Sequence, residues 1–181
     1  MNSIMEPNVI YLDNHLLVVN KQPGLLAQGD QTGDIDLLSL GRDFLKKKFN
    51  KPGNVYLGLV HRLDRPVSGA MIFARTSKAA SRLSEQFRNN YPQKKYFALV
   101  EGKCSGQGTY KNYIIKEDQK IRIVDSSIPG AKYAELTWES VAHKKDISLV
   151  SVNLKTGRSH QIRVQLAHMG FPVLGDLRYN A

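Results

Sequence analysis

The feature that most restricts the fold is a series of strand-like segments between Gly108 and Leu154. These segments are rich in β-branched and aromatic residues, and they read TYKNYIIK, KIRIVD, YAELTWESVA and ISLVSVNL. Short polar or glycine-containing turns separate them. Strands that follow one another across short turns usually pair antiparallel with their sequence neighbours. We therefore predict an antiparallel meander in this half of the chain.

The remaining segments predict further strands and three helices. Residues 9–12 and 16–20 flank a turn and are typical of a hairpin, and GAMIFAR and KKYFALVEG are also strand-like. Three segments have the apolar spacing of amphipathic helices. They are DLLSLGRDFLKKKF with Asp36 as cap, SKAASRLSEQFRNN with Ser77 as cap, and TGRSHQIRVQLAHMG with Ser159 as N-cap and Gly170 as C-cap.

These elements predict an α+β fold built on a large mixed, mainly antiparallel sheet flanked by helices. The 181 residues suit one domain spanning residues 1–181. The single cysteine, Cys104, cannot form an intramolecular disulfide and therefore indicates a reducing compartment. No signal peptide or long apolar span is visible, which predicts a cytoplasmic protein with no membrane partner.

The positive charge is concentrated in one stretch of the chain. The net charge is +10, and residues 42–103 hold 14 Lys and Arg against 4 Asp and Glu. The rest of the chain holds 12 residues of each sign. A local basic patch attracts polyphosphate backbones, although a solvated face that aids solubility would have the same composition. We favour nucleic acid because the imbalance is so local.

Asp64 lies at the centre of this basic stretch, in the motif HRLDRPVSG between two predicted strands. The neighbouring guanidinium groups of Arg62 and Arg65 favour its charged form. An ionised carboxylate can attack carbon, act as a base or bind a metal. A simple surface pair between Asp and Arg is the alternative interpretation.

Two further segments could contribute chemistry. Tyr96, beside Lys94 and Lys95, could stack on a base, although a half-buried strand tyrosine is the simpler interpretation. In TGRSHQIR, the residues before the helix could bind a phosphate through free backbone N–H groups. Arg163 lies beside the buried helix stripe and could pair with a carboxylate, or else face solvent.

Other site classes lack their motifs. The histidines are scattered, and no HExxH or paired CxxC exists, which argues against a metal site. No Walker A loop, GxGxxG or GxSxG is present, so neither a nucleotide cofactor nor a serine hydrolase is indicated. We expect no cofactor.

Taken together, three motifs in this order resemble the RluA family of RNA pseudouridine synthases. The matching segments are HRLDRPVSG, KKYFALVEG and TGRSHQIRVQLAHMGFPVLGD, and the resemblance covers about residues 9 to 179. It implies isomerisation of uridine in ribosomal or transfer RNA by a flipped-base mechanism, without cofactor or metal. It also implies a short, catalytic-core-only chain without an N-terminal RNA-binding domain. The sequence does not indicate an oligomeric state, and we expect a monomer.

The resemblance assigns roles to individual residues. Asp64 would be the essential carboxylate, Tyr96 would stack on the uracil, and Arg163 would pair with Asp64. Ile162 would line the uracil pocket, and Arg62 would contact the RNA and fill the space that the extruded base leaves. The same motifs supply four more substrate-binding candidates, which are His61, Arg65, Arg158 and His160.

The sequence departs from the family pattern at two places. Val67 stands where the family usually has Thr, so the loop around Asp64 loses a hydroxyl. The family chain usually continues beyond the point where this one stops, so we expect the sheet to lack part of the usual C-terminal segment. Two rival functions remain, which are a catalytically silent RNA-binding module of this fold and an aspartate-based nucleoside hydrolase.

Overall fold

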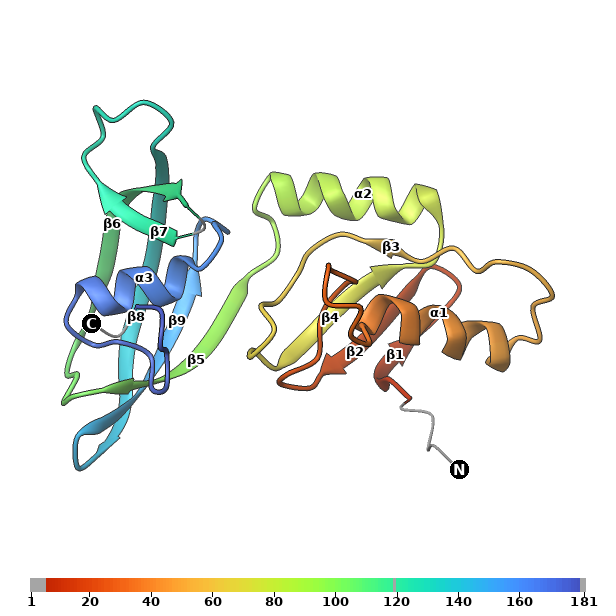
Figure 1. Cartoon of the computed structure of the whole chain (residues 1–181), viewed down its shortest axis with the longest axis horizontal. Coiled ribbons are helices and arrows are strands. Elements are labelled where there is room, and N and C mark those ends of the chain that lie inside the picture. Colours follow the sequence, from red (N-terminus) through yellow and green to blue (C-terminus); the bar gives the residue numbers. More distant parts are fainter. Residues whose placement is uncertain (1–5, 119, 180–181) are drawn as a thin grey trace. The chain divides into compact units, whose positions relative to one another are not determined.

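The computed structural model describes residues 6–118 and 120–179, and it divides into two compact units (Figure 1). The first unit ends at Tyr91, and the second begins at Pro92. Both units are α+β, which confirms the predicted fold class. The strands form a four-stranded and a five-stranded sheet, whereas the sequence predicted one large sheet. No helix among the described residues is long and apolar enough to cross a membrane.

The first unit is an antiparallel sheet covered by two helices. Its strand order is β1-β2-β4-β3, and its helices are α1 and α2. The strands are β1 (Asn8–Leu12), β2 (Leu16–Lys21), β3 (Gly58–Leu59) and β4 (Gly69–Ala74), and the helices are α1 (Leu37–Lys48) and α2 (Ser77–Arg88). The pairing of β1 with β2 confirms the predicted hairpin.

The core of the first unit lies between the sheet and α1. Leu17, Met71 and Phe73 have no exposed surface, and Leu37 and Leu45 of α1 are 1% exposed. Gly41 permits the close approach of the helix. A Cβ atom there would lie only 2.8 Å from Cδ2 of Leu57 and 3.4 Å from Cδ2 of Leu17.

Of the two helix caps predicted for the first unit, one is confirmed and one is wrong by a single residue. Asp36 caps α1 as predicted, because its Oδ1 accepts the N–H of Ser39 at 3.0 Å. The predicted cap of α2 is wrong by one residue. Thr76 has an extended backbone, and its Oγ1 accepts the N–H of Ala79 at 3.1 Å, whereas Ser77 is already helical.

The second unit is an antiparallel sheet in the order β5-β9-β8-β6-β7. The predicted meander order is therefore wrong, because β8 passes β7 and pairs with β6. The five residues of β7 pair only with the end of β6, whereas the 13 residues of β8 run along both β6 and β9. The strands are β5 (Lys94–Glu101), β6 (Gln107–Glu117), β7 (Lys120–Val124), β8 (Lys132–Lys144) and β9 (Ile147–Leu154).

Helix α3 (Gln161–His168) packs on one face of this sheet (Figure 1). Leu166 joins the core residues Val100 and Val152, so the apolar side of the helix is buried. The chain after α3 returns to the edge of β5. The N–H of Glu101 donates to the carbonyl of Pro172 at 2.9 Å, and the N–H of Leu174 donates to that of Leu99 at 2.8 Å. This segment therefore pairs with the edge of β5.

Candidate active site

Asp64 lies in the loop between β3 and β4, as predicted. It is partly buried, and its carbonyl accepts the N–H of Val67 at 3.0 Å, which closes a tight turn directly after the carboxylate. Gly69, with φ of +138°, ends the loop in a conformation that favours glycine. The sequence HRLDRPVSG thus presents one carboxylate from a short, backbone-bonded turn.

The loop is anchored by Lys21, which the sequence analysis did not identify. The side chain of Lys21 is completely buried at the end of β2. Its Nζ donates to the carbonyls of Val67 at 2.6 Å, Arg65 at 3.0 Å and Gln22 at 3.2 Å. Burial lowers the pKa of Lys21, while the nearby negative charge of Asp64 acts in the opposite direction. A buried ammonium therefore holds the backbone on the C-terminal side of Asp64.

Arg65 ties the same loop to an earlier segment. Its Nε donates to the carbonyl of Gly24 at 3.0 Å, and its Nη1 lies 2.8 Å from Oδ2 of Asp34. The N–H of Gly24 in turn donates to the carbonyl of Arg65 at 2.8 Å. A predicted contact between Arg65 and substrate would have to share or replace these bonds.

His61 has contacts within the fold. Its Nε2 accepts the N–H of Ile72 at 3.0 Å, and its ring stacks on Phe87 of α2 with 4.7 Å between centroids. Burial lowers the pKa of His61, which favours the neutral ring that this acceptor role requires. Arg62, the neighbouring candidate, is exposed.

Tyr96 lies on β5, on the face that packs against the core of the second unit. The faces of this strand alternate, because Phe97 and Leu99 on the other face are 62% and 50% exposed. Lys94, at the start of the strand, is partly buried, and burial lowers its pKa. A Cβ atom on Gly157 would lie 3.8 Å from Nζ of Lys94, so this cation lies beside the TGR segment.

The TGR segment is organised by Gln161 rather than by the predicted cap Ser159. The N-cap of α3 is His160, which has a left-handed backbone and makes no side-chain cap bond. The buried amide of Gln161 accepts the hydroxyl of Thr156 at 2.8 Å and the N–H of Arg158 at 3.0 Å. The N–H of Arg158, in the segment that was expected to lead into a phosphate site, is therefore already bonded. Nε of Arg158 donates to the carbonyl of Tyr133 at 3.1 Å.

Arg163 pairs with a carboxylate, that of Asp176. Its Nε and Nη2 donate to Oδ2 and Oδ1 of Asp176 at 2.6 and 2.7 Å, and the Asp176 side chain is only 3% exposed. Burial alone would raise the pKa of Asp176. Hydrogen bonds from Arg163 and from the backbone of Arg178 and Tyr179, with the charge of Arg163, hold this pKa below its ordinary value.

Tyr179 joins His160 to Arg163. Its hydroxyl lies 2.7 Å from Nδ1 of His160, and the Arg163 guanidinium lies 5.0 Å from the centre of its ring. His160 and Arg163 therefore contact the same tyrosine. The neighbouring Ile162 is partly buried and packs against the core of the second unit.

The predicted site residues fall into two groups, one in each unit. The first unit contains His61, Arg62, Asp64 and Arg65, and the second unit contains Tyr96, Arg158, His160, Ile162 and Arg163. The first group presents a carboxylate that can attack carbon or accept a proton. The second presents an aromatic ring and a fixed guanidinium, which suit a base and an anion. Within residues 6–118 and 120–179, no three His, Cys, Asp or Glu side chains gather as metal ligands.

Comparison with known proteins finds a family model and relatives that agree with one another. The model of the RNA pseudouridylate synthase family matches residues 15–168. The chain is 33% identical to the ribosomal large subunit pseudouridine synthase C of Buchnera aphidicola over 178 residues, which cover 95% of this chain and 54% of that protein. It is 30% identical to the tRNA pseudouridine synthase C of Haemophilus ducreyi, with coverage of 97% and 74%.

Solved structures agree with these sequence matches. The human RNA pseudouridylate synthase domain containing 4 has a TM-score of 0.81 and 25% identity, and the match covers 95% of this chain and 68% of that one. The human RNA pseudouridylate synthase domain containing 1 has a TM-score of 0.80 and 26% identity, with coverage of 100% and 72%. This chain spans about half the length of the ribosomal relatives that it matches.

Proposed function

The chain belongs to the RNA pseudouridylate synthase family, and from that premise we propose that it isomerises uridine to pseudouridine in ribosomal or transfer RNA. The observation that supports this most strongly is the extent of the family match. It covers residues 15–168, which include Asp64, Tyr96 and Arg163. The partner would be RNA, and the protein would act in the cytoplasm as a monomer without a cofactor.

The reaction exchanges one bond to the ribose for another. The bond between N1 of uracil and C1′ breaks, the uracil turns, and C5 bonds to C1′ while the C5 hydrogen leaves as a proton. Since these atoms are enclosed in a base stack, the nucleotide must first leave the stack. Basic side chains in residues 42–103 would offset the cost of that extrusion through contacts with phosphates.

Asp64 is the proposed reacting carboxylate. Two routes suit it, which are attack on C1′ of the ribose and removal of a sugar proton. Both routes require an ionised, accessible oxygen at a fixed place. The short turn that ends at Val67 and the ammonium of Lys21 behind it favour such a fixed position.

The other proposed roles concern the base and the loop. Tyr96 would stack on the flipped uracil and help to remove the C5 proton, and Ile162 would line the uracil pocket. Arg62 would fill the space that the base leaves. The pairing of Arg163 with Asp64 remains a prediction, and it is compatible with the Asp176 pair because a guanidinium has five N–H donors.

Mapping of cellular RNA tests the proposal. Total RNA from cells with and without the gene is treated with carbodiimide, which marks pseudouridine, and is then sequenced. The proposal predicts at least one site that disappears with the gene and returns with the wild-type gene but not with Asp64→Asn. Loss of no site would contradict the proposal and favour a silent RNA-binding module.

A further inference from the structure

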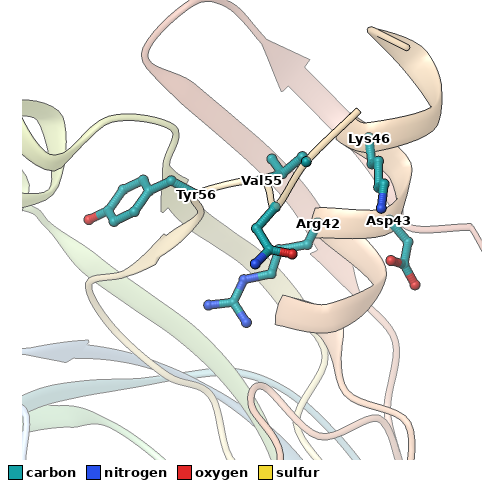
Figure 2. Close-up of a pocket in the computed structure, with 7 residues that line it drawn as sticks. Arg42, Asp43, Lys46, Val55 and Tyr56 are labelled. Carbon is teal, nitrogen blue, oxygen red and sulfur yellow. The ribbon is translucent and has the colours of Figure 1, made fainter. Parts of the chain in front are cut away.

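A hollow lies on the first unit, between α1 and the segment that leads to β3 (Figure 2). Its volume is about 600 Å³. Figure 2 shows Arg42, Asp43 and Lys46 projecting from α1, with Tyr56 on the following segment. Asn54 also lines the hollow. None of these five residues belongs to the three motifs that define the candidate active site.

The hollow has cationic groups that no protein group neutralises. Arg42 and Lys46 are four residues apart and therefore share one face of α1. Among the described residues, neither has an ion pair or a side-chain hydrogen bond, and the same is true of Asp43. The seven residues that line the hollow therefore have a net charge of +1, and both cations are exposed to solvent.

Stabilisation of the helix end explains only part of this arrangement. Lys46, Lys47 and Lys48 occupy the last turn of α1, where positive charge offsets the helix dipole. Arg42 lies in the middle of the helix, where that effect has faded. Tyr56 is not on the helix; it lines the hollow from the other side, and 50% of it is exposed. A ligand would account for both residues together.

The ring of Tyr56 lies against Gly58 of β3. A Cβ atom on Gly58 would lie 2.8 Å from the hydroxyl of Tyr56 and 3.4 Å from Cζ, so the phenol occupies space that any side chain would fill. An aromatic ring that packs on one side and is exposed on the other is suited to stacking. Together with two nearby cations and an amide, it matches the groups of an unpaired nucleotide.

We propose that this hollow binds a single-stranded RNA segment outside the reacting nucleotide. Arg42 and Lys46 contact phosphates, Tyr56 stacks on an unpaired base, and Asn54 bonds to the edge of that base. The inference rests on the proposed function, because it takes RNA as the substrate. It adds a second contact region that would help to select which uridine is presented to Asp64.

Binding of a fluorescent oligouridylate of about 16 nucleotides, the upper length of a single-stranded site, tests the charge contacts. Affinity is measured at several salt concentrations. The double variant Arg42→Gln/Lys46→Gln should reduce the salt slope by about 1.4, because each single-strand phosphate contact contributes about 0.7. The matched control is Lys47→Gln/Lys48→Gln, which removes the same charge from the same helix outside the hollow.

Two tyrosine variants test the stacking. Tyr56→Ala should weaken binding about tenfold, whereas Tyr56→Phe should bind like the wild type. Tyr91→Ala is the control, since Tyr91 is 73% exposed and lies outside the hollow. Thermal unfolding of each variant shows whether the fold is intact.

The outcomes separate this inference from the proposed function. Equal salt slopes for the two double variants, or unchanged binding by Tyr56→Ala, would overturn the hollow as an RNA site. Both results are independent of whether the wild type forms pseudouridine in cellular RNA. If binding is lost as predicted but no pseudouridine forms, the hollow stands as an RNA site and the enzymatic proposal fails.

Discussion

The loop of Asp64 and the helix of Arg163 are fixed by opposite means. In the first unit, the buried cation Lys21 bonds to backbone carbonyls around the loop. In the second unit, the buried anion Asp176 bonds directly to the guanidinium of Arg163. One anchor therefore shapes the backbone that presents a charged group, and the other holds the charged group itself. We expect the second kind of anchor to be more sensitive to substitution.

Among the variants that test this comparison, a replacement of Asp176 should have the largest effect on stability and turnover. Asp176→Asn removes the buried charge that pairs with the Arg163 guanidinium, and we expect a loss of about 3 kcal/mol in the free energy of unfolding. Turnover should also fall about 10- to 100-fold, because Arg163 is no longer fixed. Chemical denaturation and single-turnover rates measure the two effects.

Asp146→Asn is the matched control for this variant, because Asp146 is exposed in a turn. It removes the same charge and should change neither quantity. If Asp176→Asn were as stable and as active as the control, direct anchoring of Arg163 would be contradicted.

Replacement of Lys21 should have a smaller effect. Lys21→Met removes three hydrogen bonds from the buried ammonium, and we expect a loss of about 2 kcal/mol in the free energy of unfolding. Turnover should fall less than in Asp176→Asn, because the turn that closes at Val67 has its own backbone bond. Lys111→Met, at an exposed strand lysine, is the control. If Lys21→Met lost more turnover than Asp176→Asn, the expectation that the Asp176 anchor is the more sensitive one would be contradicted.

The pH dependence of stability should show the smallest effect. The folded pKa of Asp176 lies below its ordinary value of 3.8, so its contribution is complete above that pH and is lost as the pH falls through the folded pKa. The difference between wild type and Asp176→Asn should therefore shrink in acid. A difference that stays constant down to the lowest pH would contradict this assignment.

Lys21 should instead change the unfolding free energy at alkaline pH. Its folded pKa lies below 10.5, mainly because of burial, so the folded state loses this proton before the unfolded state does. Its contribution to the unfolding free energy should rise with pH between the folded pKa and 10.5. Lys21→Met should lack that rise, which denaturation at several alkaline pH values would measure.

Local structure could be predicted where a few neighbouring residues determine it. The hairpin around residues 13–15, the cap Asp36 and the loop position of Asp64 follow from turn residues, capping and apolar runs. The strand order of the second sheet could not be predicted, because short turns indicate pairing of sequence neighbours, whereas β8 passes β7 and pairs with β6. That choice depends on contacts between distant residues.

The anchors of the site were missed for a similar reason. Lys21 lies two and four residues after Val19 and Leu17, so the alternation of β2 places it on the buried face, but a lysine usually indicates solvent. Gln161 and Asp176 gave no comparable signal, because a polar side chain at a helix start or in a turn usually indicates solvent, and only the fold shows that both are buried. The residues that hold the site are therefore less visible in the sequence than those proposed to react.

Release of tritium from RNA that contains uridine labelled at C5 tests the central claim most directly, since the C5 hydrogen must leave when pseudouridine forms. The RNA is prepared from cells that lack the gene and supplied in single-turnover amounts. We predict release by the wild type and by Asp146→Asn. Asp64→Asn should release none, although it binds the same RNA with unchanged affinity. Release by Asp64→Asn at the wild-type rate would contradict the assignment of Asp64 as the reacting carboxylate.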